Sequence, residues 1–451
     1  MGLEIEIGWL TLIMFGSLLL LLAAGLPLAF VTGGLACVFL FVLGDAQTLN
    51  IVPSRIFPLM TDYQLSAIPL FIFMAAMLER AGLIKEMFDV IYKLLGGLKG
   101  GLASATIIAS TILAAMVGVI GAAVVTMGII ALPAMLARKY DTKIAMGSIM
   151  AGGTLGILIP PSILAIIYAV VAEQSVGELF IGAVIPGLML SGFYILYVTI
   201  MSNLDPEKGP PIPVSERIDF REKLLLLKQM AAPIILILVV FSVLFSGAAT
   251  PVEAAGIGTF GAFIVAALHR QLNWSTAREA VITTLKASSM VIWIMFGATI
   301  FVGLYVLEGG QAFVTESLAA TGLGPWGILI LMQILLIILG MFLDWVGILL
   351  LCVPIFVPII KGLGAAAFGL DDSGDLVLWF GVLYLVNMQM SFLSPPFGYA
   401  LFYLRGVAPD HIPMSDIFKA ALPFLGLQVV GLALCMYFPQ IITWLPKMVY
   451  G

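Results

Sequence analysis

Two stretches decide the fold of this chain: Gly156-Ile-Leu-Ile-Pro-Pro-Ser162 and Ser391-Phe-Leu-Ser-Pro-Pro-Phe-Gly398. Each interrupts an apolar run of membrane-spanning length with two adjacent prolines. Adjacent prolines remove two backbone donors and end helical hydrogen bonding. Inside a bilayer, non-helical backbone persists only where protein buries it or where it lines a cavity. One such break in each half of a chain is typical of a repeat-built secondary transporter whose binding site lies at the breaks.

The composition indicates a polytopic helical membrane protein. Of the 451 residues 62% are hydrophobic and 10% are charged, and the mean hydropathy is +1.17. Soluble domains do not have this composition. No basic patch interleaved with aromatic residues is present, so we expect no nucleic acid partner. The three cysteines lie singly in apolar runs and the two histidines lack a second ligand nearby, so we expect no transition-metal site and no organic cofactor. The first residues carry neither a basic region nor a cleavage site, which predicts an uncleaved first span.

Apolar runs predict about ten transmembrane helices: 8–24, 27–43, 66–80, 144–172, 179–201, 231–247, 251–268, 285–307, 376–404 and 416–438. Two further apolar stretches, 102–137 and 326–361, are long enough to cross twice. Small residues interrupt the first at 118–123, and an acidic residue ends the interruption of the second at 340–344. We interpret both stretches as re-entrant hairpins that enter and leave on one side.

The two halves of the chain then correspond. A first repeat (1–202) and a second repeat (229–451) flank a cytoplasmic linker (203–228). Each repeat has three spans, an amphipathic arm (84–98 or 309–321), a hairpin, a proline-broken span and a closing span. Five spans per repeat is an odd number, so the second repeat is inverted. The predicted fold is therefore an all-α polytopic membrane protein of two inverted repeats, with two re-entrant hairpins.

The distribution of charge predicts the orientation. With the N-terminus outside, 17 of the 20 Lys and Arg residues fall on the cytoplasmic side, and only Arg55, Lys361 and Lys447 fall outside. Such a bias is what the positive-inside rule expects. The parity at the linker is unchanged if both hairpins cross the bilayer fully. Charge therefore supports the orientation but not the re-entrance.

A hairpin tip that faces a broken helix encloses a small cage. The broken ends offer free N–H groups to anions and free carbonyls to cations. Gly and Ala let backbone oxygens approach an ion closely. Sodium, a hard cation, suits these carbonyls and nearby hydroxyls. We predict a first sodium site at Gly118, Gly121, Ala122, Thr154, Gly156, Pro160 and Ser162, and a second at Gly340, Asp344, Ser391, Ser394 and Pro395.

Two acidic residues lie in apolar surroundings. Asp344 stands in an otherwise uncharged stretch, 326–360. A charge within the membrane costs at least about 2.5 kcal/mol, so an ion or substrate role is the default hypothesis, with helix capping as the alternative. Glu253 follows Thr250 and Pro251 in the order of a helix start. Thr250 is predicted to be the N-cap and Glu253 to complete a capping box.

The energy source is predicted to be an ion gradient. No Gly-rich loop followed by Lys-Ser or Lys-Thr is present, and no polar segment is long enough to hold a nucleotide. Each sodium ion that enters down the membrane potential contributes about 2.3 kcal/mol per 100 mV.

These motifs resemble, over nearly the whole chain, those of the large membrane subunit of tripartite ATP-independent periplasmic (TRAP) transporters. The matching segments are Ala67-Ile-Pro-Leu-Phe-Ile-Phe, Gly121-Ala-Ala-Val-Val-Thr-Met-Gly, Gly153-Thr-Leu-Gly-Ile-Leu-Ile-Pro-Pro-Ser, Ala249-Thr-Pro-Val-Glu-Ala-Ala, Gly340-Met-Phe-Leu-Asp344 and Ser394-Pro-Pro-Phe-Gly-Tyr-Ala-Leu-Phe-Tyr-Leu-Arg405. The segments Ala131-Leu-Pro-Ala-Met-Leu and Leu401-Phe-Tyr-Leu-Arg-Gly-Val-Ala-Pro are similar to the subgroup labelled mannitol/chloroaromatic-compound transport.

The resemblance implies a sodium symporter in the bacterial inner membrane that works by an elevator mechanism and is not an enzyme. It also implies a small four-helix membrane subunit and a periplasmic substrate-binding protein, which delivers a small molecule such as a carboxylate. By position, the family's ion sites fall at the two tips and breaks. Substrate is then expected between them, near Asp344, Ala123 and Arg405. Many members carry serines at the first tip, where this chain has Gly121-Ala122-Ala123.

Two other classes of membrane protein do not fit the sequence, and a third does. A channel needs a ring of charges or a carbonyl filter motif, and neither is present. A membrane-embedded enzyme needs intramembrane His, Cys or paired acids, and Asp344 has no such partner in the sequence. A stand-alone ion-coupled carrier of the same fold, without a binding protein, remains an open alternative.

Overall fold

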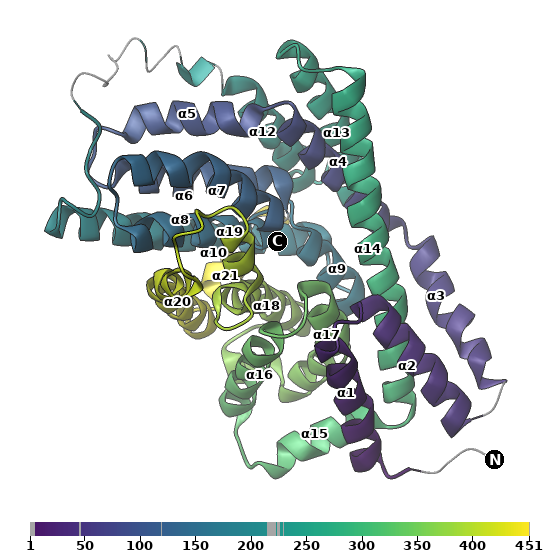
Figure 1. Cartoon of the computed structure of the whole chain (residues 1–451). Helices are drawn as coiled ribbons and strands as arrows, with labels where there is room; N and C mark the ends of the chain where they lie inside the picture. The colour runs from purple at the N-terminus through teal and green to yellow at the C-terminus, as the bar shows by residue number, and fades with distance from the viewer. Residues whose placement is uncertain are drawn as a thin grey trace.

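The computed structural model describes residues 5–44, 47–118, 120–213, 222, 226–228 and 230–450, and every regular element in these ranges is helical (Figure 1). The first part of the chain forms α1 (Ile7–Ala23), α2 (Leu28–Leu43), α3 (Ile51–Thr61), α4 (Ala67–Arg80), α5 (Leu83–Leu95), α6 (Gly101–Val117), α7 (Ile120–Ala137), α8 (Thr142–Thr154), η3 (Leu155–Ile157), α9 (Ile163–Ala172) and α10 (Val176–Leu204). The rest forms α12 (Ala231–Phe245), α13 (Pro251–Leu268), α14 (Trp274–Leu307), α15 (Gly310–Ala320), α16 (Pro325–Gly340), α17 (Trp345–Leu363), α18 (Ser373–Leu393), α19 (Tyr399–Arg405), α20 (Met414–Tyr437) and α21 (Gln440–Tyr450). Short 3₁₀ turns are η1 (Thr48–Asn50), η2 (Tyr63–Ser66) and η5 (Ala365–Phe368).

Helices occupy all of the predicted spans. In the described residues, seven helices are long and apolar enough to cross a membrane, or eight if α3 and α4, bent by 60°, are counted as one span. The structure adds α3 and α21, which apolar runs do not reveal because both are short and contain proline. Most of the charged second part of the predicted linker lies outside the described residues.

Both predicted hairpins are pairs of helices that touch each other, α6 with α7 and α16 with α17. The first hairpin turns after α6, which Gly118 caps, and the second turns at 341–344, where the sequence predicts interruptions. α7 has 18 residues and α17 has 19, so each is about 27 Å long, close to the thickness of a bilayer core. The lengths of α7 and α17 therefore do not decide whether the hairpins cross the bilayer or enter and leave on one side. The re-entrant hairpins and the inverted second repeat both stay predictions.

The helices pack as two layers. One, the α14 layer, consists of α2, α3, α4, α12, α13 and α14, and α14 touches α2, α3 and α4 along its length (Figure 1). The other, the hairpin layer, consists of α6 to α10 and α16 to α20. Within the hairpin layer α8 packs against α6, α7 and α20, and α18 packs against α16, α17 and α20.

The halves of the hairpin layer also pack against each other. α7 touches α19, and α17 touches α9. The second helix of each hairpin therefore lies on the broken helix of the other half. Because the hairpin tips lie at the N-termini of α7 and α17, this arrangement brings both tips to the centre of the layer.

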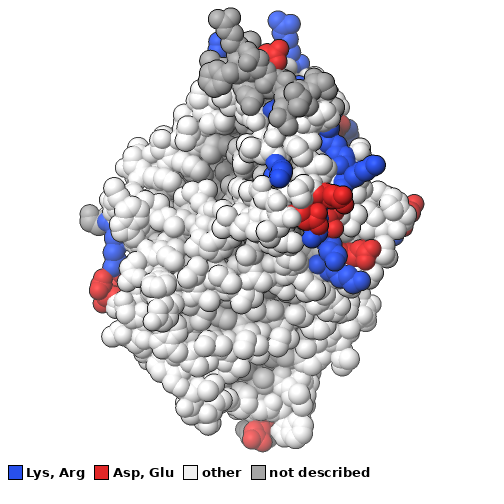
Figure 2. All heavy atoms as spheres, turned by 90° about the vertical axis from the view of Figure 1, so that its left-hand side faces the viewer, with Lys and Arg blue, Asp and Glu red and all other residues white. Residues whose placement is uncertain are grey.

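Charged side chains occupy restricted parts of the surface. Figure 2 shows them gathered along the edges of one face, with a broad uncharged area between them. Arg80 of α4 pairs with Glu279 of α14 at 3.0 Å, and Lys447 of α21 pairs with Asp375 of α18 at 2.7 Å. The first pair joins charges predicted to be cytoplasmic, and the second joins charges predicted to be outside. An uncharged surface of this kind suits contact with lipid acyl chains.

The predicted capping box of α13 is confirmed. The Glu253 N–H donates to the Thr250 hydroxyl at 3.3 Å, and the Thr250 N–H donates to the Glu253 carboxylate at 2.8 Å. The two residues satisfy backbone donors that the first turn of a helix leaves free. Glu253 therefore has a structural role at a helix start.

Glycines set the closest approach within the α14 layer. A Cβ built on Gly297 of α14 would overlap the hydroxyl of Thr32 and lie 2.5 Å from the Ala29 carbonyl, both on α2. A Cβ on Gly33 of α2 would lie 3.5 Å from the Gly297 Cα. Small residues at a crossing allow two membrane helices to pack backbone against backbone.

We predict that Gly297→Ala lowers the thermal stability of the protein in detergent. The added methyl group must push α2 away from α14, and such over-packing costs about 1–3 kcal/mol. Gly256→Ala in α13 is the matched control, because a Cβ there meets no atom within 4 Å. Unfolding monitored by a thiol-reactive dye measures both variants. Equal midpoints would contradict the close packing of α2 on α14.

Candidate functional site

The first break is fully buried. η3 ends at Ile157, and residues 158–162 are non-helical before α9 begins. The Ser162 hydroxyl donates to the Ile157 carbonyl and accepts from the Ala165 N–H, so it caps α9. None of the described residues donates a hydrogen bond to the carbonyls of 158–161. These oxygens remain as acceptors at the end of a half-helix, where a cation is favoured.

The first tip touches this break through a glycine. α6 ends at Gly118, whose φ of +60° is the left-handed conformation that glycine adopts most easily. A Cβ on Gly118 would lie 2.7 Å from the carbonyl oxygen of Pro161. The tip backbone can therefore lie directly against the open carbonyls of the break.

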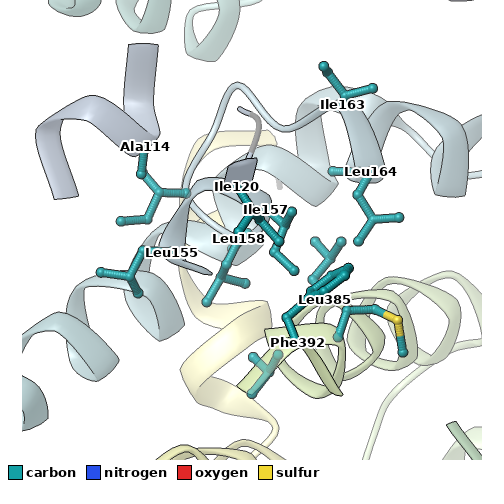
Figure 3. Close-up of a cluster of buried hydrophobic side chains, with 14 of the residues drawn as sticks. Ala114, Ile120, Leu155, Ile157, Leu158, Ile163, Leu164, Leu385 and Phe392 are labelled. Atoms are coloured by element: carbon teal, nitrogen blue, oxygen red, sulfur yellow. The ribbon is translucent and has the colours of Figure 1, made fainter. Parts of the chain in front are cut away.

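Apolar side chains surround the first break. Figure 3 shows Ile157 and Leu158 next to Ile120 of the first hairpin, with Leu385 and Phe392 of α18 below them. On another side, a Cβ on Gly187 of α10 would lie 2.6 Å from the Ile159 side chain. Buried apolar packing of this kind excludes water and holds the break in one position.

The second tip meets the second break at Gly340 and Ser391. A Cβ on Gly340 would overlap the Ser391 side chain, so only glycine fits at this point. The Ser391 hydroxyl donates to the Asn387 carbonyl at 3.3 Å, and the Ser394 hydroxyl donates to the Met390 carbonyl at 2.7 Å. Ser391 and Ser394 are buried, Pro395 is half-buried and Pro396 and Phe397 are exposed.

Asp344 ends the second tip and caps α17. Its Oδ1 accepts a hydrogen bond from the Gly347 N–H at 3.0 Å, and its side chain is half-buried. Asp344 also lines a cavity. The sequence suggests for Asp344 either a helix cap or a residue of the site. The observed geometry allows both roles at once.

A cavity of about 200 Å³, named here the central cavity, lies between the two tips. It is lined by Ile72 of α4, Ile120 and Gly121 of the first tip, Ile163 of α9, Ala287, Met290 and Val291 of α14, Asp344 and Trp345 of the second tip, and Phe392, Tyr399 and Tyr403 of α18 and α19. Met290, Asp344 and Tyr399 also line a neighbouring cavity of about 510 Å³ that extends to the turn between α1 and α2. Both layers of the protein thus line two adjacent cavities, which share these three residues.

The structure brings some of the candidate site residues together. Gly121 and Asp344 both line the central cavity, and Gly118 and Gly340 each lie against a break. Gly156 and Pro160 are buried in the first break. The hydroxyl of Thr154 accepts from the Gln428 amide at 3.4 Å.

Ala122, Ala123 and Arg405 are among the candidates that do not line the central cavity. Ala122 is half-buried and Ala123 is 2% exposed, and neither lines the cavity. Arg405 lies at the far end of α19, where its guanidinium donates to the Ile412 carbonyl at 2.8 Å. This hydrogen bond indicates that Arg405 links α19 to the loop that follows it.

Sequence reasoning missed the aromatic and amide residues of the site. Tyr399 and Tyr403 are spaced i, i+4 directly after the second break, so they share one face of α19. Gln428 is fully buried in an apolar span, and a glutamine within such a span is the sequence signal that points to it. Tyr399, Tyr403 and Gln428 all lie in segments that the apolar pattern of the sequence identifies only as membrane helices.

Comparison with known proteins places the chain in a family. The model of the family described as "Tripartite ATP-independent periplasmic transporter, DctM component" matches residues 15–441. The chain belongs to this family. It is therefore a TRAP transporter large permease and not an enzyme, as its sequence motifs predict.

Similar permeases have been named for different substrates. The chain is 31% identical to the C4-dicarboxylate TRAP transporter large permease protein DctM of Pseudomonas aeruginosa, over 92% of this chain and 93% of the relative. It is 28% identical to the sialic acid TRAP transporter large permease protein SiaM of Vibrio cholerae, over 96% and 97%. It is also 28% identical to the isethionate TRAP transporter permease protein DctMQ of Oleidesulfovibrio alaskensis, over 95% of this chain but 65% of that longer protein.

Solved structures share the fold of this permease. The Alcanivorax borkumensis YdaH transporter superposes with a TM-score of 0.66 at 13% sequence identity, covering 95% of this chain and 99% of that one. Neisseria gonorrhoeae MtrF superposes with a TM-score of 0.58 at 15% identity, covering 87% and 85%. Identities this low indicate a common fold and nothing about substrate.

We predict that Gly340→Ala reduces the initial rate of transport by this permease at least about tenfold. Its methyl group must displace Ser391 from the second tip, at an over-packing cost of about 1–3 kcal/mol. Gly362→Ala, at the other end of the same hairpin, is the control, because a Cβ there meets no atom within 4 Å. Uptake into proteoliposomes measures the rate, and circular dichroism checks that the helices are intact. Full activity of Gly340→Ala would show that the tip and the break need not touch.

Proposed function

We propose that this permease is the membrane-spanning carrier of a sodium-driven uptake system for a small organic acid, and that it operates by an elevator mechanism. The observation that carries the proposal is the meeting of two hairpin tips and two broken helices around one cavity. Such breaks are where secondary transporters bind substrate and coupling ions.

Sodium coupling is supported by the oxygens at each break. The open carbonyl of Pro161 lies beside Gly118, and the second break places Ser391 beside Gly340. Backbone carbonyls and hydroxyls are ligands that hard cations prefer. We assign one sodium site to each tip and break, with Asp344 at the second. In this proposal Ser162 and Ser394 orient the broken ends.

The partners follow from the family. A tripartite system requires a small membrane subunit and a periplasmic binding protein that delivers the substrate. The relative named DctMQ extends well beyond the length of this chain, as a fused permease would. The proposed location is the bacterial inner membrane with the N-terminus in the periplasm, as the positive-inside bias predicts. The similarity of this chain to the mannitol/chloroaromatic subgroup stays a prediction.

The elevator mechanism is supported by the two-layer packing. The hairpin layer holds both tips and both breaks, whereas the α14 layer supplies one wall of the central cavity. We propose that the hairpin layer moves as a block along the α14 layer. A stand-alone carrier of the same fold, independent of a binding protein, is the competing function.

We predict that Asp344→Asn retains the fold but loses at least about 90% of sodium-driven uptake. Asparagine caps a helix about as well as aspartate, so α17 keeps its start, while the negative charge of the cavity is removed. Asp372→Asn is the matched control, because Asp372 caps α18 in the same way and does not line the central cavity.

Uptake is measured in proteoliposomes that contain this chain, the small subunit and the binding protein, with labelled organic acids and an imposed sodium gradient. Uptake that requires both sodium and the binding protein supports the proposal. Uptake that is indifferent to the binding protein would favour the stand-alone carrier. Uptake by Asp344→Asn at the rate of the unmodified protein would remove Asp344 from the mechanism.

A further inference from the structure

The lining of the central cavity has an unusual chemical composition for a site that receives an anion. Of the described residues that line it, Asp344 is the one with a charged side chain, and it is negative. No Lys or Arg is among them. The other lining side chains are aliphatic or aromatic, with the thioether of Met290, and their polar groups are the hydroxyls of Tyr399 and Tyr403 and the indole N–H of Trp345.

Aromatic rings form one continuous wall of this cavity. The rings of Phe392 and Tyr399 have centroids 5.6 Å apart in an edge-to-face arrangement, and those of Tyr399 and Tyr403 have centroids 6.5 Å apart. Gly121 packs directly on this wall, where a Cβ would lie 3.1 Å from the Tyr403 ring. A side chain at position 121 would have to push the Tyr403 ring, so the glycine fixes where this ring stands at the first tip. Aromatic rings in such a wall favour a flat, apolar partner.

Charge balance limits the substrate further. Two sodium ions, one at each proposed site, offset Asp344 and leave a single positive charge for the substrate to neutralise. A monocarboxylate completes the balance, whereas a dicarboxylate leaves one negative charge without a partner. An unpaired charge in a site of low dielectric is costly. A polyhydroxylated substrate meets a related penalty, because its hydroxyl groups find few polar partners on this lining.

We propose that the central cavity selects a small monocarboxylate with a flat apolar body, such as a single aromatic ring, and that Gly121 and Tyr403 set the size of the body it accepts. The ring lies against Tyr399 and Tyr403, and the carboxylate faces the sodium ions at the tips. The volume of about 200 Å³ suits a body of one ring. This inference rests on the proposed sodium-coupled function, and it separates this permease from relatives named for C4-dicarboxylates and sialic acid.

Ligand-induced stabilisation tests the proposal without the selectivity of a binding protein. The complex of this chain with its small membrane subunit is heated in detergent with benzoate, succinate or N-acetylneuraminate, in sodium or in potassium chloride. A ligand that binds the folded state raises its unfolding midpoint according to its concentration and affinity. We predict that benzoate in sodium stabilises the complex at a concentration at least about tenfold below the concentration of succinate with the same effect. N-acetylneuraminate is expected to have no effect.

Two variants test the roles of the wall. Gly121→Ala narrows the cavity and is expected to weaken the effect of 2-naphthoate more than that of benzoate. Tyr403→Ala widens it and is expected to strengthen the effect of 2-naphthoate relative to benzoate. Tyr437→Ala is the control, because Tyr437 lies on α20 and is 74% exposed. A benzoate-to-naphthoate ratio unchanged in both variants would refute the role of the wall.

The outcomes separate this inference from the proposed function. Equal or stronger stabilisation by succinate, or none by benzoate at 10 mM (about a hundredfold above a 0.1 mM dissociation constant), would overturn the selectivity for a monocarboxylate. Sodium-driven uptake of a dicarboxylate in the complete system would leave the proposed function standing and refute this inference. Benzoate stabilisation of equal size in sodium and potassium would support the apolar site and count against sodium coupling.

Discussion

Broken backbone inside a membrane needs either partners or a lined cavity, and this constraint organises the permease. Adjacent prolines at each break remove donors, and the carbonyls of 158–161 are left without donors among the described residues. A lipid-exposed helix could not carry such oxygens. The first break is accordingly enclosed by α6, α10 and α18, and the hairpin layer is built around it.

Because the two halves of the hairpin layer pack crosswise, both halves build the central cavity. α7 lies on α19 and α17 lies on α9, so neither half positions its tip by its own contacts alone. The central cavity consequently takes its lining from both tips and both broken helices. A substitution in one half, such as one at Gly121, is therefore felt by a residue of the other, such as Tyr403. Contacts of this kind can carry energetic coupling between the two halves.

Much of the fold and only part of the site could be predicted from the sequence. Hydrophobic length and the proline pairs predict the spans, the hairpin turns and the breaks, because these features are local. The capping box at Thr250 is local as well. The positions of Arg405 and Tyr403 are not: both lie on α19, and only the tertiary packing of α19 on α7 determines that Tyr403 reaches the cavity and Arg405 does not. Short amphipathic helices such as α21 are also invisible to apolar length, since their stability comes from the surface on which they pack.

The two breaks differ in their exposure. Every residue of 156–162 is buried, whereas Pro396 and Phe397 are exposed. Phe397 and Phe342 line a third cavity, of about 810 Å³, and their ring centroids are 5.5 Å apart. Two breaks of similar sequence thus differ, because protein encloses the first and leaves the second open on one side. A water-soluble or lipid-soluble molecule can therefore reach the prolines of the second break directly, whereas the first break is reached only when the helices around it separate.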